Sequence, residues 1–149
     1  MKNIFRAPVD NQHFKDTIEA GKPVNEVASF LAGEQRAKVQ RIAKDDSVRY
    51  WGSVPGESNR RNLEKLTEGD ELLCYRSGNY IALAKIAFTT INRDLAKYSW
   101  GETETGLTWE LVYFFSDVKL FEIDAGVINK EFGYSEGQLW ALGQSAMKK

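Results

Sequence analysis

The chain has 149 residues, and 20 lysines and arginines against 21 aspartates and glutamates give it a formal net charge of -1. This length fits a single domain with a sizeable core, and the balanced charge excludes a strong overall attraction to nucleic acid or acidic lipid. Its only cysteine, Cys74, and its only histidine, His13, exclude an internal disulfide and leave too few ligands for an ordinary Cys/His zinc site. We expect no metal and no cofactor.

The start of the chain lacks an apolar signal core, and no run of about 18 apolar residues occurs anywhere. The expectation is a cytoplasmic protein without a membrane partner, forming one domain over residues 1–149.

The first part, about 1–46, shows apolar residues at three- and four-residue steps, which predicts helices. A first helix includes 14–18, a second covers 24–31 with Asn25 as a possible cap, and a polar third covers 35–44.

From position 47 the apolar period changes to two. The sequence predicts a strand over 47–51, a helix over 57–66 with Ser58 as its cap, and a hairpin of strands 71–76 and 80–88 turning at Ser77-Gly78-Asn79.

A short helical pattern follows over 89–98. Two apolar runs, 107–115 and 118–123, predict a second hairpin turning at Ser116-Asp117. Residues 129–149 predict two short helices, with Ser135 as a possible cap. Short strands with hairpin connections and inserted helices favour an α+β fold built on a small β-barrel over a doubly wound sheet.

No convincing catalytic set occurs in the sequence. His13 lacks an obvious serine or cysteine partner, and Cys74 lies mid-strand, where cysteines usually act as small apolar fillers. We therefore expect no enzyme activity. The one acidic and basic cluster that an enzyme on such a barrel would use consists of Asp94, Lys97, Glu102 and Glu104.

Two tryptophans, Trp51 and Trp100, each end a predicted element and are each followed by glycine. Glycine lets the backbone turn sharply or approach a ligand, and a tryptophan offers a large rigid face on which a base stacks. Two such faces would clamp a flat ring. The structural alternative is that both indoles only plug the ends of the barrel.

The segment "YWGSVPGESNRRNLEKLTEGDELLCYRSGNYIALAKI" resembles the central part of EVE and YTH domains of the PUA-like superfamily. In those families a tryptophan ends a strand, and a turn, a polar helix and a hairpin follow. The matching positions are Trp51, Gly52, Ser53, Pro55, Asn59 and Leu63.

A second segment, "YSWGETETGLTWELVYFF", is similar to the region where YTH domains supply another pocket tryptophan. This match implies that Trp100 is the second wall and that Leu107 or Thr108 closes the floor. The likeness covers about 47–124 and leaves out the N-terminal strand of those families.

The resemblance implies a small PUA-like β-barrel with flanking short helices that captures a flipped, methylated base in an aromatic cage. Such domains also stand at the N-terminus of modification-dependent restriction proteins, so the implied partners are DNA with a methylated base and other subunits of a restriction complex. In this interpretation Gly52, Ser53 and Asn59 read the base edge. The phosphate contacts come from nearby cations: Arg49, Arg60, Arg61, Lys65 and Lys97.

The sequence leaves open whether the ligand is DNA or RNA and which modification it carries. An alternative of a different class is a protein-interaction or sensor domain that presents Tyr98 and Trp100 as exposed anchors.

Overall fold

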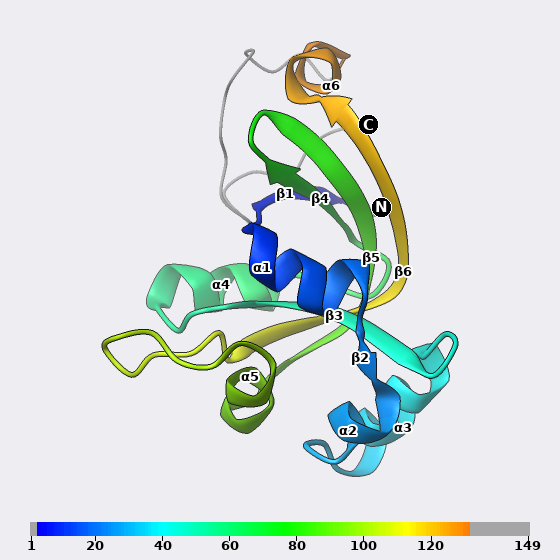
Figure 1. Cartoon of the computed structure of the whole chain (residues 1–149), viewed down its shortest axis with the longest axis vertical. Coiled ribbons are helices and arrows are strands. Elements are labelled where there is room, and N and C mark those ends of the chain that lie inside the picture. The colour runs from blue at the N-terminus through cyan, green and yellow to red at the C-terminus, as the bar shows by residue number, and fades with distance from the viewer. Residues whose placement is uncertain (1–2, 132–149) are drawn as a thin grey trace.

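A computed structural model describes residues 3–131 as a bent sheet with most of its short helices around the middle and lower part and one helix at the upper end (Figure 1). The strands are β1 Ile4–Pro8, β2 Lys22–Pro23, β3 Ser47–Ser53, β4 Glu71–Arg76, β5 Asn79–Ile91 and β6 Leu111–Asp124. The helices are α1 Asn11–Phe14, the π-helix η1 Lys15–Glu19, α2 Val24–Ala28, α3 Gly33–Ile42, α4 Glu57–Lys65, α5 Arg93–Trp100 and α6 Ala125–Glu131.

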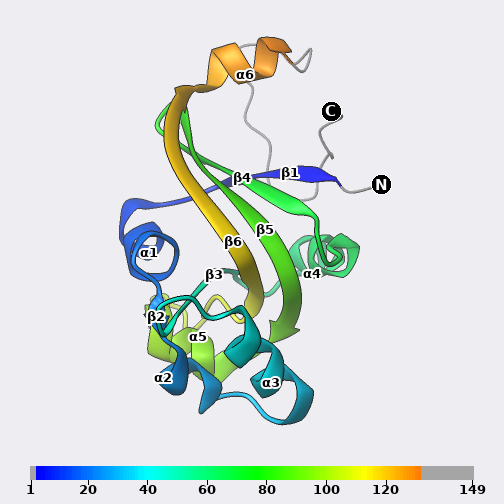
Figure 2. The same cartoon turned by 90° about the vertical axis from the view of Figure 1, so that its right-hand side faces the viewer.

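The strands join in the order β1-β4-β5-β6-β3-β2, with β1 parallel to β4 and every other pair antiparallel. The long strands β5 and β6 bend together over their whole length (Figure 2). Their pairing shifts register near Tyr80, Lys85 and Ile86. Such irregularities bend a strand and increase its twist, which allows this sheet to curl around its contents.

Alternation along β6 separates two cores on the two faces of the sheet. Leu111, Tyr113 and Phe115 belong to a core that also contains residues of β1, η1 and α4. Val112 and Phe114 belong to a second core, shared with α2, α3 and α5. Because successive side chains point to opposite faces, both faces of this central strand are covered.

Several predicted elements are confirmed. The strand beginning at Ser47, the polar helix after Gly56 and the hairpin that turns at Ser77-Gly78 all occur as β3, α4 and β4–β5. The predicted caps are wrong: Gly56 is the N-cap of α4, and Pro23 is the N-cap of α2.

The helical interpretation of residues 1–46 is incomplete, because this part also contributes β1 and β2 to the sheet. Four of the five residues of β1 are buried, so it has no alternating pattern, and its partner β4 lies more than 60 residues away. Local sequence does not reveal a pairing of that kind.

The predicted hairpin turning at Ser116-Asp117 is wrong, because β6 runs without interruption through both residues. Asp117 pairs with Lys85 of β5. The helix expected from Thr89 begins later, at Arg93, since β5 continues to Ile91. Pairing between the two long strands outweighs the local turn signal. The helices expected within 132–149, including the cap at Ser135, lie outside the described residues.

Within residues 3–131, none of the helices has the length and apolar character that crossing a lipid bilayer requires.

Candidate functional site

Trp51 and Trp100 belong to different cores and meet beside Gly52. Trp51 is buried in the first core, and Trp100, at the end of α5, packs against the second. Their ring centroids are 6.4 Å apart with 64° between the ring planes. The two indoles therefore touch edge to face, and a base held between them would need the rings to separate and turn parallel.

Gly52 makes this meeting possible. A Cβ atom at position 52 would lie 2.5 Å from Cζ3 of Trp100 and 2.5 Å from the carbonyl oxygen of Trp109. Real Cβ atoms do not approach other atoms so closely, so any side chain here would push the indole away. Gly52 therefore allows the Trp100 ring and the Trp109 carbonyl group to pack against β3.

His13 and Trp109 complete an aromatic cluster. The centroid of the His13 imidazole lies 4.5 Å from that of Trp109, 5.8 Å from Trp100 and 6.2 Å from Trp51. His13 is the third residue of α1, and the Asp10 side chain caps that helix by accepting the backbone N–H of His13. Helix α1 therefore holds the imidazole over three indoles, which come from β3, from α5 and from the segment just before β6.

A cavity of about 260 Å³ opens beside this cluster. Its volume lies slightly below the range of about 300–1,000 Å³ typical of sites for drug-sized ligands, so it suits a small group. The lining residues are Ala7, Pro8, Asp10, Trp51, Gly52, Ser53, Val54, Asn59 and Trp109. Of the three clustered tryptophans, Trp51 and Trp109 line the cavity and Trp100 does not.

Three polar residues line this cavity: Asp10, Ser53 and Asn59. The Nδ2 of Asn59 donates to the carbonyl oxygen of Val54 at 2.9 Å, which fixes the turn after β3 to helix α4. The hydroxyl of Ser53 shares a hydrogen bond with the hydroxyl of Tyr113, and burial raises the pKa of Tyr113 to about 12. The Asp10 carboxylate is more than half exposed, with Oδ2 at 3.2 Å from Nδ1 of His13.

The loop between α5 and β6, residues 101–110, carries the other residues predicted for the cage. Thr108 is buried and its hydroxyl donates to the carbonyl oxygen of Gly101 at 2.6 Å, so it closes the loop. Leu107 is 42% exposed and belongs to neither core. Neither residue lines the cavity.

The predicted phosphate contacts divide into two groups. Arg60, Arg61 and Lys65 are exposed on α4, the helix that brings Asn59 to the cavity, and Arg61 pairs with Glu57 at 3.1 Å.

The other two cations lie elsewhere. Arg49 lines a separate cavity of about 310 Å³ formed with Lys44, Asp117 and other residues, and its Nη2 donates to the carbonyl oxygen of Glu19. Lys97 pairs with Glu102 at 3.2 Å.

The cluster considered for an enzyme does not converge in a cleft. Lys97 and Glu102 form the ion pair above, Asp94 and Glu104 are exposed, and none of the four lines either cavity. Cys74 is buried, and burial raises the pKa of its thiol to about 12, so the thiolate form is disfavoured. No group of three or more histidine, cysteine, aspartate or glutamate side chains within 3–131 is placed to hold a metal ion.

The fold is shared with a solved structure. The N-terminal domain of Thermococcus gammatolerans McrB, determined bound to m5C DNA, superposes on this chain with a TM-score of 0.68 at 17% sequence identity. The match covers 99% of this chain and 91% of that one. No protein-family model matches the sequence, and no curated protein matches it. The expected α+β fold is confirmed.

The predicted set lacked Asp10 and Trp109 at the cavity and His13 in the aromatic cluster. It also lacked the apolar lining residues Ala7, Pro8 and Val54. Trp109 was visible as one more tryptophan between a loop and an apolar run, and only its lack of a following glycine set it apart from Trp51 and Trp100. Asp10 and His13 gave no local signal, because the long-range pairing of β1 with β4 brings Asp10 to the cavity and His13 to the aromatic cluster.

Proposed function

We propose that this chain is a reader of methylated DNA, without catalytic activity of its own, that takes a flipped base into the cavity bordered by Trp51 and Trp109. The observation that supports this proposal is the cavity of about 260 Å³, which two tryptophans, an aspartate and an asparagine line. The chain also shares the fold of a domain solved with m5C DNA. Trp100 does not line the cavity, but its ring packs against the backbone of Gly52, which does.

Stacking supplies much of the binding free energy in this proposal. Extruding a nucleotide costs a few kcal/mol, and stacking a base on an aromatic side chain returns roughly 1–3 kcal/mol. A base methyl group buried against an indole adds about 0.8 kcal/mol, which corresponds to about fourfold in affinity. The expected preference for methylated DNA is therefore modest.

The polar groups of the cavity favour a base with an exocyclic amino group. Carboxylates accept hydrogen bonds from the N4 amino group of cytosine, and Asp10 is the carboxylate on this cavity. 5-Methylcytosine would place its amino group toward Asp10 while its methyl group lies against an indole. N6-methyladenine also keeps one amino hydrogen for such a contact, so the titration below includes both bases.

The exposed cations of α4 are suited to hold the phosphates beside the extruded base. Arg60 and Arg61 follow directly after the cavity residue Asn59 in the same helix. Phosphate contacts of this kind position the duplex without reading its sequence. They also make the affinity fall as salt is added.

The proposed role is the DNA-recognition module of a modification-dependent restriction system. Its test is a fluorescence-anisotropy titration of this chain with labelled duplexes containing 5-methylcytosine, N6-methyladenine or no modification, and with the matching RNA. We expect the tightest binding to a methylated DNA duplex. Equal affinity for methylated and unmodified duplexes, or no binding to any of them, contradicts the proposal.

A further inference from the structure

Leu107 is an apolar side chain that the fold presents to solvent in the loop leading to the cavity residue Trp109. It is 42% exposed in the loop of residues 101–110, whose two ends carry Trp100 and Trp109. Trp109 borders the cavity and is only two residues away. Since a residue spans at most about 3.6 Å of chain, the Cα atoms of Leu107 and Trp109 are within about 7 Å, or roughly two nucleotide steps of a duplex strand.

The loop that carries Leu107 is held by its own hydrogen bonds. The N–H of Thr103 donates to the carbonyl oxygen of Leu107 at 2.6 Å, and the N–H of Leu107 donates to Oγ1 of Thr103 at 3.1 Å. The N–H of Gly106 donates to the carbonyl oxygen of Thr103 at 3.0 Å. Thr108 closes the base of the loop through Gly101.

Arg93 of α5 adds a clamp from outside the loop. Its Nη2 donates to the carbonyl oxygen of Gly106 at 2.9 Å and lies 3.5 Å from the Glu102 carboxylate, while its Nη1 lies 3.5 Å from Glu110. Lys97 also pairs with Glu102, so two cations offset this acidic part of the loop. A loop fixed in this way inserts a side chain with little further loss of conformational entropy.

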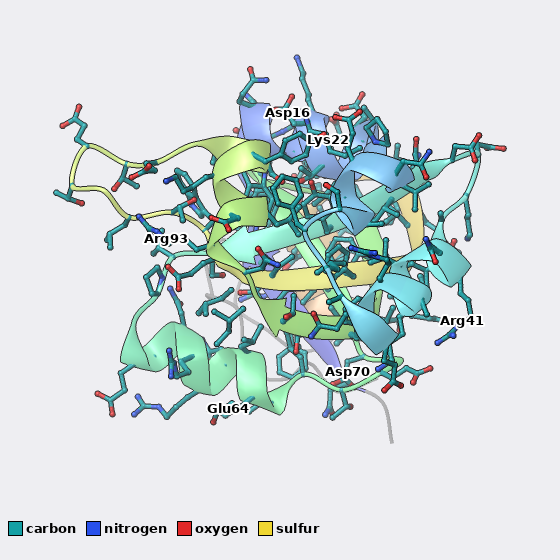
Figure 3. The ribbon with its side chains drawn as sticks, turned by 90° about the horizontal axis from the view of Figure 1, so that it is seen from below. Asp16, Lys22, Arg41, Glu64, Asp70 and Arg93 are labelled. Carbon is teal, nitrogen blue, oxygen red and sulfur yellow. The ribbon has the colours of Figure 1, made fainter. Side chains whose placement is uncertain are left out.

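The loop and helix α4 extend from the same side of the molecule, with β3 ending between them (Figures 1 and 3). Arg93 marks the loop's base in Figure 3. A duplex whose phosphates follow Arg60 and Arg61, with one base in the cavity, would therefore bring its stacked bases against the loop.

We propose that Leu107 is a wedge that enters the base stack at the place vacated by the extruded nucleotide. This inference rests on the proposed function and adds the residue that keeps the duplex open. Apolar side chains inserted between base steps stabilise partly unstacked DNA, because they replace lost stacking contacts with apolar burial. Leu107 would act on the DNA opposite the cavity and would not touch the captured base.

The test compares Leu107→Ala with the unchanged chain on three DNAs that contain the same 5-methylcytosine. The first pairs it with guanine, the second places it opposite an abasic site, and the third is single-stranded. A wedge matters where a paired, stacked base must be extruded, so we expect Leu107→Ala to weaken binding about tenfold on the first and little on the other two.

Leu120→Ala is the matched control, since Leu120 is a leucine of similar exposure, 48%, on β6. It should bind all three DNAs as the unchanged chain does. If Leu107→Ala weakens all three DNAs equally, Leu107 contacts the base or the backbone, and the wedge is overturned. No effect on any DNA also overturns it. Failure of the proposed function appears separately, as an unchanged chain that does not distinguish methylated from unmodified DNA.

Discussion

The Trp100 indole lies against the backbone of Gly52 so closely that position 52 has no room for a methyl group. A Cβ atom there would come within 2.5 Å of Cζ3 and 2.8 Å of Cη2 of the ring. This contact joins the end of α5 to the end of β3 and fixes the position of Gly52, a residue that lines the cavity. Its consequence is a prediction in which stability and binding change together.

Gly52→Ala should displace Trp100 and destabilise the chain by about 1–3 kcal/mol, the usual cost of overpacking. Affinity for methylated DNA should fall as well, because the cavity wall moves. Urea denaturation and anisotropy titration measure the two effects. Gly56→Ala is the control, since a Cβ there meets nothing within 4 Å and the residue's backbone is extended. Equal behaviour of the two variants would show that the Trp100 contact is unimportant.

Trp109→Ala should reduce affinity for methylated DNA by a factor of about 5–150, which corresponds to the roughly 1–3 kcal/mol that a stacked base loses with its aromatic partner. Circular dichroism checks that the Trp109→Ala variant remains folded. Tyr98→Ala removes an exposed aromatic whose hydroxyl bonds to Glu26, away from the cavity, and should leave DNA binding unchanged. Loss of binding only in the Tyr98 variant would favour a different surface.

Asp10→Asn separates the helix-capping role of Asp10 from its proposed contact with the amino group of a base. Asparagine caps helices about as well as aspartate, so α1 should keep its N-terminus. The lost charge weakens the hydrogen bond from a base amino group, and affinity for 5-methylcytosine DNA should fall about tenfold. Asp16→Asn, a neutralised carboxylate on η1 that bonds to Gln12, serves for comparison. Wild-type affinity in Asp10→Asn would remove the carboxylate from base recognition.

Arg60→Gln should weaken binding to methylated and unmodified DNA by similar factors. If Arg60 contacts one phosphate, the slope of log affinity against log salt should become shallower by about 1. Titrations at several salt concentrations measure it. Arg41→Gln changes an exposed arginine at the end of α3, distant from α4 in Figure 3, and should keep the slope. An unchanged slope for Arg60→Gln would exclude a phosphate contact there.

Cys74 should resist thiol reagents in the folded protein and react only on unfolding, because it is buried and its pKa is raised to about 12 from an ordinary 9.0. Between these values the unfolded chain loses the thiol proton while the folded chain keeps it. The contribution to stability is therefore complete below about pH 9 and is lost as the pH rises toward 12. Denaturation midpoints of the chain and of Cys74→Ala across this range test the sign. Fast labelling at neutral pH would contradict the burial.

Local pattern was sufficient for elements with clear turn residues or apolar periods of their own, including β3, although its partner β6 is far away in the sequence. The hairpin β4–β5, the strand around Trp51 and helix α4 carry their own turn residues and apolar periods, so the sequence predicts them. It also indicated that Trp51 and Trp100 would come together, from their shared Trp-Gly pairs and a family resemblance. In contrast, β1 and the continuous β6 depend on pairing with strands chosen by the whole sheet.

What the sequence by itself determined is the class of group at the site: indoles beside glycines and a polar helix with arginines, with one cysteine and one histidine, too few for an ordinary Cys/His zinc site. Only the tertiary structure decided which rings border the cavity. Trp51 and Trp100 pack in different cores and touch past Gly52, while Trp109 and Asp10 arrive from the segments just before β6 and just after β1. The face on which a side chain lies follows from strand register, and register is a property of the assembled sheet.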